Sequence, residues 1–414
     1  MLGKRILHSF EPSFLASEAR RIALKLKRKI IRPDARRVVL EPDGEVRGEV
    51  LFSYILDPFL LRSGQKVPHW HTHYWESHRM AMSFVELGYR VEAISWTNKK
   101  FQPERPYDAV VDVRLNLQRW APLLGTDAVK IFHIDTSHWS FNNGAQGERL
   151  ERLRQERGLK IRPVKMVPEN RGIEVADCGT VLGNEFTQET YSFAGKPLYR
   201  IPISSTVTFP WPEGKSFEAP RRRFLWFGSG GLVHKGLDLV LEAFAGLPDF
   251  ELVVCGPIRR ERDFERAYFR ELYETPNIHT EGWVDVAGQR FQEIARSCLG
   301  VVYPSCSEGG GGSVISCLHA GLIPVVTREA SVDVSEDFGV VLRAATIEEI
   351  RRSVRALSER SPAQLEAMAR AAWAFARQHH TREGFARAYG RFAARIADGS
   401  WRQGVSGPPS EAAP

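Results

Sequence analysis

The stretch from Val302 to Val326 constrains the fold of this chain more than any other part of the sequence. It reads VYPSCSEGGGGSVISCLHAGLIPVV, which predicts a buried strand, a glycine-rich turn, a helix and a second buried strand. One carboxylate, Glu308, precedes the glycines at positions 309–312. Glycine lets the backbone approach a ligand closely, and free N–H groups at a helix start attract anions. The stretch therefore predicts an anion site at a strand-to-helix turn.

A second turn of the same kind lies upstream, where FGSGGLVHKG covers Phe227 to Gly236 and includes Lys235. Two such turns in one α/β domain predict a phosphorylated ligand at the carboxyl ends of parallel strands. A structural role for the glycines in tight turns is the alternative.

Strands and helices alternate along both halves of the chain, which predicts an α/β fold with parallel sheets. A segment with three prolines separates the two halves and reads as a linker. The predicted boundaries are an extension over 1–45, a first domain over 46–205, a linker over 206–222, a second domain over 223–382 and, after one more helix over 383–398, a disordered tail over 399–414.

The composition indicates an ordinary globular protein, with 43% hydrophobic and 26% charged residues. We expect no membrane span and no signal peptide, because no apolar run is long enough for either. The five cysteines form no C-x-x-C pair, which favours reduced core thiols in the cytoplasm over disulfides or a zinc site. A catalytic role for Cys306 stays open.

Much of the net charge of +7 lies between residues 20 and 37, where nine basic residues face one acidic residue. Interleaved apolar residues favour contact with an anionic membrane surface, while a solvated arm is the alternative. No nucleic-acid-binding module accompanies this charge, so we expect no nucleic-acid partner.

Four stretches of the second half carry a family resemblance: FGSGGLVHKGLDLVLEAF, LVVCGP, IHTEGWV and YPSCSEGGGGSVISCLHAGLIPVVT, in that order. They resemble the carboxyl-terminal domain of GT-B glycosyltransferases of the retaining group 1 (family 4) type. The first half resembles that family only in its strand–helix pattern. The resemblance implies two Rossmann-like domains facing across a cleft, with the helix over 383–398 crossing back to the first domain.

The resemblance also implies a site for a nucleoside-diphosphate sugar. Gly228, Ser229 and Lys235 would meet the diphosphate, and Gly282 and Trp283 would lie beside the base. Glu308 would hold hydroxyls of the sugar. The N–H groups of the four glycines Gly309, Gly310, Gly311 and Gly312 would face the phosphate or the sugar.

Two positions depart from the family pattern. Gly230 stands where the family usually has a basic side chain, and Ser316 stands where it has a second glutamate. These departures put the identity of the donor in question.

Transfer from such a donor builds negative charge on the departing diphosphate, which preorganised N–H groups and a lysine stabilise. The sequence contains no Asp-x-Asp pair and no cluster with metal-ligand spacing. We therefore expect no metal and no cofactor besides the nucleotide-sugar substrate.

Histidines of the first half are further candidates. The loop HWHTHYWESH carries His69, His71, His73 and His78, and FHIDTSHW carries His133 and His138. The family often places a functional histidine near the second of these segments. His138 is the preferred catalytic candidate because it lies beyond the predicted strand, and His133 is the alternate; a core or loop role for either stays open.

The sequence thus predicts a cytoplasmic GT-B glycosyltransferase, peripheral at the inner face of the membrane if the basic segment binds lipid. Its acceptor would be a saccharide or lipid-linked saccharide in polysaccharide biosynthesis. A nucleotide-sugar epimerase of the same fold and a non-catalytic nucleotide-sugar-binding protein are the alternatives.

Overall fold

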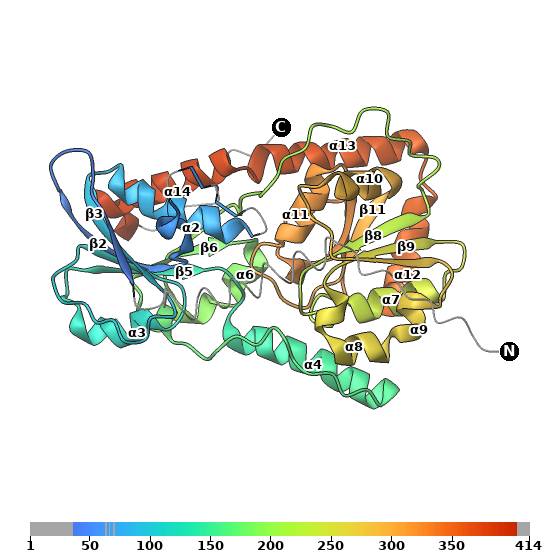
Figure 1. Cartoon of the computed structure of the whole chain (residues 1–414), viewed down its shortest axis with the longest axis horizontal. Coiled ribbons are helices and arrows are strands. Elements are labelled where there is room, and N and C mark those ends of the chain that lie inside the picture. Colours follow the sequence, from blue (N-terminus) through green and yellow to red (C-terminus); the bar gives the residue numbers. More distant parts are fainter. Residues whose placement is uncertain (1–35, 63, 66, 69–70, 404–414) are drawn as a thin grey trace.

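The computed structural model describes residues 36–403 except 63, 66, 69 and 70. Its elements form two α/β domains side by side (Figure 1). The basic segment over 20–35 and the tail from 404 onward lie outside the described residues, so those predictions stay predictions.

The first domain is built on a seven-stranded sheet in the order β1-β3-β2-β4-β5-β6-β7, parallel except for β1. The strands are β1 (Arg37–Leu40), β2 (Gly48–Tyr54), β3 (Tyr89–Ser95), β4 (Ala109–Asp112), β5 (Val129–Ile134), β6 (Cys178–Leu182) and β7 (Leu198–Ile201). The helices are α2 (Thr72–Val85), α3 (Asn116–Trp120), α4 (Trp139–Arg157), α5 (Gly172–Val175) and α6 (Glu185–Glu189).

The second domain is built on a six-stranded, all-parallel sheet in the order β10-β9-β8-β11-β12-β13. The strands are β8 (Arg223–Phe227), β9 (Glu251–Cys255), β10 (Ile278–Gly282), β11 (Gly300–Tyr303), β12 (Ile323–Thr327) and β13 (Val340–Leu342). The helices are α7 (Leu237–Ala245), α8 (Arg262–Ala267), α9 (Phe269–Tyr273), α10 (Gln289–Ser297), α11 (Gly312–His319), α12 (Ile347–Ser358), α13 (Pro362–His379) and α14 (Arg382–Ala397).

Several central strands are buried along their whole length because helices cover both faces of each parallel sheet. All residues of β6, β11 and β12 are buried, which is why these runs lack the alternation of a half-exposed strand. The predicted α/β fold with two parallel sheets is confirmed.

Strand β1 departs from the sequence prediction, because it lies within the segment expected to be an extension. Its side chains alternate between exposed and half-buried, and it pairs antiparallel with β3 at the edge of the sheet. A four-residue edge strand among charged residues gives only a weak pattern, so the sequence did not single it out.

The proline-rich segment between the domains contains no helix or strand, yet it is packed rather than loose. Phe209, Trp211 and Phe217 are buried in the core of the second domain, and Trp211 lies edge-on to Trp373 of α13 at a ring distance of 6.0 Å. The connection therefore follows the surface of the second domain.

Two helices cross between the domains (Figure 1). Helix α4 follows β5 of the first domain, but its Leu153 is buried in the core of the second. Helix α14 follows the second domain, and its Phe385, Tyr389 and Phe392 complete the core of the first. These crossings hold the carboxyl ends of the two sheets against each other.

Candidate active site

A cavity of about 520 Å³ lies between the two domains, with both sheets contributing to its lining. Among the residues predicted from the sequence, the lining includes Gly228, Ser229, Lys235, Trp283, Glu308, Gly309, Gly310, Gly311, Gly312 and Ser316. Gly230 and Gly282 are not part of this lining. The two glycine turns, far apart in the sequence, thus open on one cavity.

Lys235 and Glu308 form an ion pair at the floor of this cavity. Lys235 also donates to the Tyr303 hydroxyl at 2.7 Å, and that hydroxyl donates to Oε1 of Glu308 at 2.9 Å. Ser305 donates to the same oxygen at 3.2 Å. Because three donors converge on Oε1, the carboxylate is fixed while Oε2 has no protein donor among the described residues.

The pKa of Glu308 is lowered to about 2, although burial by itself acts in the opposite direction. The positive charge of Lys235 outweighs that burial, with help from His234 and Lys165. Glu308 is therefore ionised near neutral pH. An ionised carboxylate is a strong acceptor for hydroxyl groups of a ligand.

The turn between β8 and α7 has fewer free N–H groups than its sequence suggests. The N–H of Gly228 donates to the carbonyl of Cys255 at 3.0 Å. The N–H groups of Gly231 and Leu232 donate to the carboxylate of Glu261, which is 6% exposed. Sequence reasoning missed Glu261, because nothing in the motif indicates which side chain closes the turn.

The glycines after Glu308 allow close packing between the domains and provide backbone N–H groups that can donate hydrogen bonds. A Cβ at Gly309 would lie 2.3 Å from the carbonyl oxygen of Asp135, so this glycine lets the two domains touch. The N–H groups of residues 309–311 have no acceptor among the described residues. They are left as donors at the start of α11.

The first domain contributes a charged cluster that the sequence analysis did not single out. Arg114 and Asp135, which follow β4 and β5, form an ion pair, and His73 Nδ1 lies 3.7 Å from Asp135 Oδ2. The Tyr54 hydroxyl donates to the same Oδ2 at 3.5 Å. Arg114 lies two residues after β4 and Asp135 directly follows β5, positions that mark the carboxyl edge of a sheet.

Electrostatics keep this cluster in one charge state near neutral pH. Burial acts to raise the pKa of Asp135, but Arg114 and the two neighbouring histidines lower it overall. Burial lowers the pKa of His73 to about 4 and that of His71 to about 3. The cluster therefore presents an ionised carboxylate beside neutral imidazoles. His71, His73, Arg114 and Asp135 also line an adjoining cavity of about 340 Å³.

Neither histidine expected to be catalytic lines the cavity between the domains. His133 points along the sheet, 1% exposed, and its Nδ1 lies 2.7 Å from the Thr180 hydroxyl. His138 caps α4 and packs edge-on against Tyr191 and Phe193, with ring distances of 5.3 Å and 4.9 Å. His138 was expected to face the cleft, but in the structure its ring packs against aromatic side chains. His138 is the residue just before α4, which begins at Trp139, and this position directs its ring toward Tyr191 and Phe193.

Lys165 is a further cation at the cavity that the sequence did not indicate. It lies in the segment between α4 and α5, and its stem packs against Gly231 of the second domain. Its backbone is held by α4, because its N–H donates to Gln146 at 3.1 Å and its carbonyl accepts from Asn142 at 2.7 Å.

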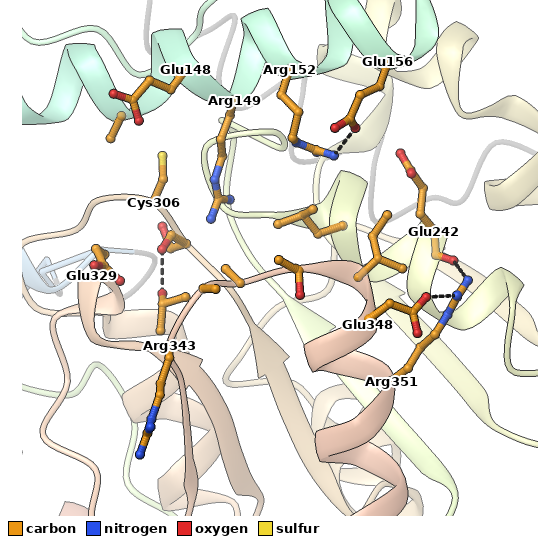
Figure 2. A pocket seen from close by; sticks show the side chains of 18 of the residues that line it. Glu148, Arg149, Arg152, Glu156, Glu242, Cys306, Glu329, Arg343, Glu348 and Arg351 are labelled. Carbon is orange, nitrogen blue, oxygen red and sulfur yellow. Dashed lines mark hydrogen bonds and ion pairs between the residues drawn. The ribbon is translucent and has the colours of Figure 1, made fainter.

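A larger cavity, of about 1180 Å³, lies between α4, α7 and α12 and contains none of the predicted donor residues (Figure 2). Its charged side chains are largely paired with one another, as Arg152 is with Glu156 at 2.9 Å and Arg351 is with Glu348. Cys306 lies at its edge, and burial raises the pKa of that thiol to about 11, so it is not a thiolate nucleophile.

Within the described residues, no group of three or more His, Cys, Asp or Glu side chains has the arrangement of a metal site. The described helices likewise include none long and apolar enough to cross a bilayer.

Comparison with known proteins agrees with this geometry. Residues 221–360 match the family model of glycosyl transferases group 1, a range that begins just before β8 and ends after α12. No curated protein matches the sequence.

Solved structures establish the fold at low identity. Sucrose-phosphate synthase from Thermosynechococcus elongatus has a TM-score of 0.58 at 12% identity, covering 85% of this chain and 100% of that chain. The N-terminal domain of Candida albicans trehalose-6-phosphate phosphatase has a TM-score of 0.56 at 10% identity, covering 87% and 99%. Anabaena HepE, solved with UDP and glucose, has a TM-score of 0.50 at 11% identity, covering 85% and 100%.

The chain spans only 55% of the length of a TarM chain from S. aureus that it also matches, at a TM-score of 0.47 and 11% identity. The family match and the two facing sheets nevertheless agree with each other. Residues 221–360 thus match the model of glycosyl transferases group 1 within a chain that has the GT-B fold.

Proposed function

We propose that this protein transfers a sugar from a nucleoside-diphosphate sugar to a saccharide acceptor. The observation that carries the proposal is the Lys235–Glu308 pair, which lies where two glycine turns open on one interdomain cavity. The Anabaena HepE structure, which shares the fold, was solved with UDP and glucose.

The two members of the pair have different tasks in this proposal. Lys235 and the N–H groups over 309–311 stabilise the charge that builds on the departing diphosphate, and each such donor lowers the barrier by about 3 kcal/mol. Glu308 accepts hydrogen bonds from hydroxyls of the transferred sugar through Oε2. Trp283, at the cavity wall, lies beside the base.

The acceptor binds, in this proposal, in the adjoining cavity of about 340 Å³ on the first domain. Asp135 borders both cavities, so a group bound there reaches the sugar from the opposite side to Glu308. We further propose that transfer needs no metal, because lysine and amide groups supply the positive charge at the phosphates, and that it retains the anomeric configuration, as the family resemblance implies.

A ligand screen tests the proposal. UDP, GDP and ADP, and then their sugars, are added to the protein while its unfolding temperature is followed. One nucleoside diphosphate should stabilise the fold by about 2.7 kcal/mol at a hundredfold excess over its dissociation constant. If none of the three changes the unfolding temperature, the proposed donor site is refuted.

Release of nucleoside diphosphate from the matching sugar then separates the candidate functions. A transferase releases it when an acceptor is present, an epimerase changes the sugar without an acceptor, and a binding protein does neither. Transfer that is unchanged in EDTA supports the metal-free proposal. The anomeric signal of the product in a proton NMR spectrum reports retention or inversion.

Membrane contact through residues 20–37 is a separate proposal, supported only by the charge of that segment. Removal of residues 1–35 leaves β1 intact, since that strand begins at Arg37. The truncated protein should sediment less with vesicles containing anionic lipid than the full chain does. Equal sedimentation of the two would rule out the contact.

A further inference from the structure

Lys165 approaches the second domain from the first. A Cβ at Gly231 would lie only 2.4 Å from Lys165 Cγ, and Gly231 has a φ of +90°. The bare backbone at Gly231 is therefore what admits the lysine stem over the β8–α7 turn. From there Lys165 lines the same cavity as Ser229 and Lys235.

Lys165 differs from the other cations of that lining in having no partner. Lys235 is paired with Glu308, and Arg114 is paired with Asp135. Lys165 forms no ion pair with any described residue. The positive charge of Lys235, followed by burial, lowers the pKa of Lys165, although Glu308, Glu261 and Asp135 act in the opposite direction. Repulsion by Lys235 is therefore the largest electrostatic influence on Lys165.

The turn beneath Lys165 adds to the need for a side-chain cation. Glu261 accepts the N–H groups of Gly231 and Leu232, so these amides do not face a ligand. Gly230 brings no side chain to the turn. Within the turn, Lys235 is therefore the one side-chain cation, and a second cation can reach an anion there only from another segment.

We propose that Lys165 completes the diphosphate site from the opposite domain, so that the donor is held between Lys235 of the second domain and Lys165 of the first. This inference rests on the proposed function, because it assigns a residue to the donor of that reaction. An anion placed between the two lysines relieves their repulsion and draws the 158–171 segment onto the β8–α7 turn. Donor binding and the position of that segment become linked.

The first test compares Lys165→Met with Lys160→Met, a matched control in the same segment that lies outside the cavity lining. Calorimetry measures binding of the nucleoside diphosphate selected by the screen and of the corresponding nucleoside, which has no phosphate. Because a charge-assisted contact is lost, Lys165→Met should weaken nucleoside diphosphate binding about tenfold. Nucleoside binding should not change, Lys160→Met should match the wild type, and Lys165→Arg should keep most of the affinity.

The outcomes separate this inference from the proposed function. If the wild type binds no nucleoside diphosphate, the proposed function fails. If the wild type binds one and Lys165→Met binds it equally well, only the role of Lys165 is overturned.

Hydrogen exchange followed by mass spectrometry gives an independent readout. Saturating nucleoside diphosphate should slow exchange in the 158–171 segment of the wild type and of Lys160→Met. The Lys165→Met protein, saturated with the same ligand, should lack this slowing. Equal slowing in Lys165→Met would show that the segment responds without the lysine and would overturn the proposal.

Discussion

Each of the two domains has a cation–carboxylate ion pair beyond the carboxyl ends of its parallel strands, but the residues around the two pairs differ. Lys235 and Glu308 follow strands of the second sheet, and Arg114 and Asp135 follow strands of the first. Around Glu308 lie glycine turns with free N–H groups. Around Asp135 lie a tyrosine and neutral histidines. In the proposed function, the second domain supplies most of the charge stabilisation, through Lys235 and the amides beside Glu308, and Asp135 of the first domain contacts hydroxyl groups of the sugar.

Two glutamates, the half-buried Glu308 and the buried Glu76, also differ in their acidity. Lys235 helps to lower the pKa of Glu308 to about 2 against the effect of burial. Among the described residues, no lysine or arginine forms an ion pair with Glu76 of the first domain, and burial raises its pKa to about 7. The two glutamates thus differ in whether a lysine offsets the effect of burial.

The largest expected effect comes from Lys235→Met. The substitution removes the cation at the leaving group and leaves Glu308 without its partner, so the transfer rate should fall about a hundredfold or more. Initial rates of nucleoside diphosphate release, measured at saturating donor, check this. Lys160→Met serves as the control for loss of an ordinary lysine. A change of less than threefold would break the assignment of charge stabilisation to the second domain.

The next effect concerns Glu76, whose Oε1 accepts from the backbone and hydroxyl of Ser204, both at 2.8 Å. Its pKa is about 7 in the native state against 4.5 as the ordinary value, so its contribution to stability is full below pH 4.5 and is lost as the pH rises through 7. By the size of that shift, the loss amounts to about 3 kcal/mol.

Glu76→Gln removes the titrating group and keeps the acceptor for Ser204. The free energy of unfolding in urea, measured from pH 4.5 to pH 8, should fall less with pH in this variant than in the wild type. Glu308 has the opposite sign, since its stabilising contribution is present above pH 4.5 and is lost as the pH falls toward 2. Parallel curves for wild type and Glu76→Gln would contradict the assignment.

A smaller effect is expected from Asp135→Asn, which keeps the shape of the side chain and removes its charge. In the proposed function this carboxylate contacts the sugar, so the rate should fall about tenfold through loss of charge-assisted hydrogen bonds. Affinity for the bare nucleoside diphosphate should change little, because in the proposal that ligand lies between Lys235 and Lys165 and not against Asp135. Calorimetry beside the rate assay sharpens the division between the domains, and equal losses in both would erase it.

The smallest effect on rate is expected from His138→Ala. The ring packs against Tyr191 and Phe193 and lies outside the cavity lining, so the substitution should lower the unfolding temperature while the rate changes less than threefold. A loss of rate comparable with that of Lys235→Met would restore His138 as a catalytic residue.

The donor side of the site could be predicted because its residues lie in contiguous turns between apolar strands. Glycines beside Glu308 and Lys235 mark strand-to-helix turns, and parallel strands bring such turns to one edge. The two parallel sheets could also be predicted, because their strands are runs of mostly apolar residues. A strand with one face in solvent would instead alternate apolar and polar residues.

The first domain's part of the site was harder to predict because its residues come singly from separate loops. Asp135 and Arg114 each follow a strand, and that position is the only local signal they give. Lys165 gives none, since its place depends on α4 holding an irregular segment and on Gly231 leaving room for its stem. His138 was preferred because it lies past its strand. The direction of its ring, however, depends on how α4 packs against the rest of the domain, which the local sequence does not determine.

Helix α14 has a consequence for how the protein is made. Its aromatic side chains finish the core of a domain whose strands were synthesised long before it. The first domain is thus discontinuous in the chain, and its core is completed only after the second domain has been synthesised. Until α14 has been synthesised, the apolar surface around Phe84 and Tyr199 has no helix packed against it. A fragment ending at the interdomain segment would leave that surface exposed, so a truncation or fusion should keep the chain through α14 and Trp401, which belongs to the same core.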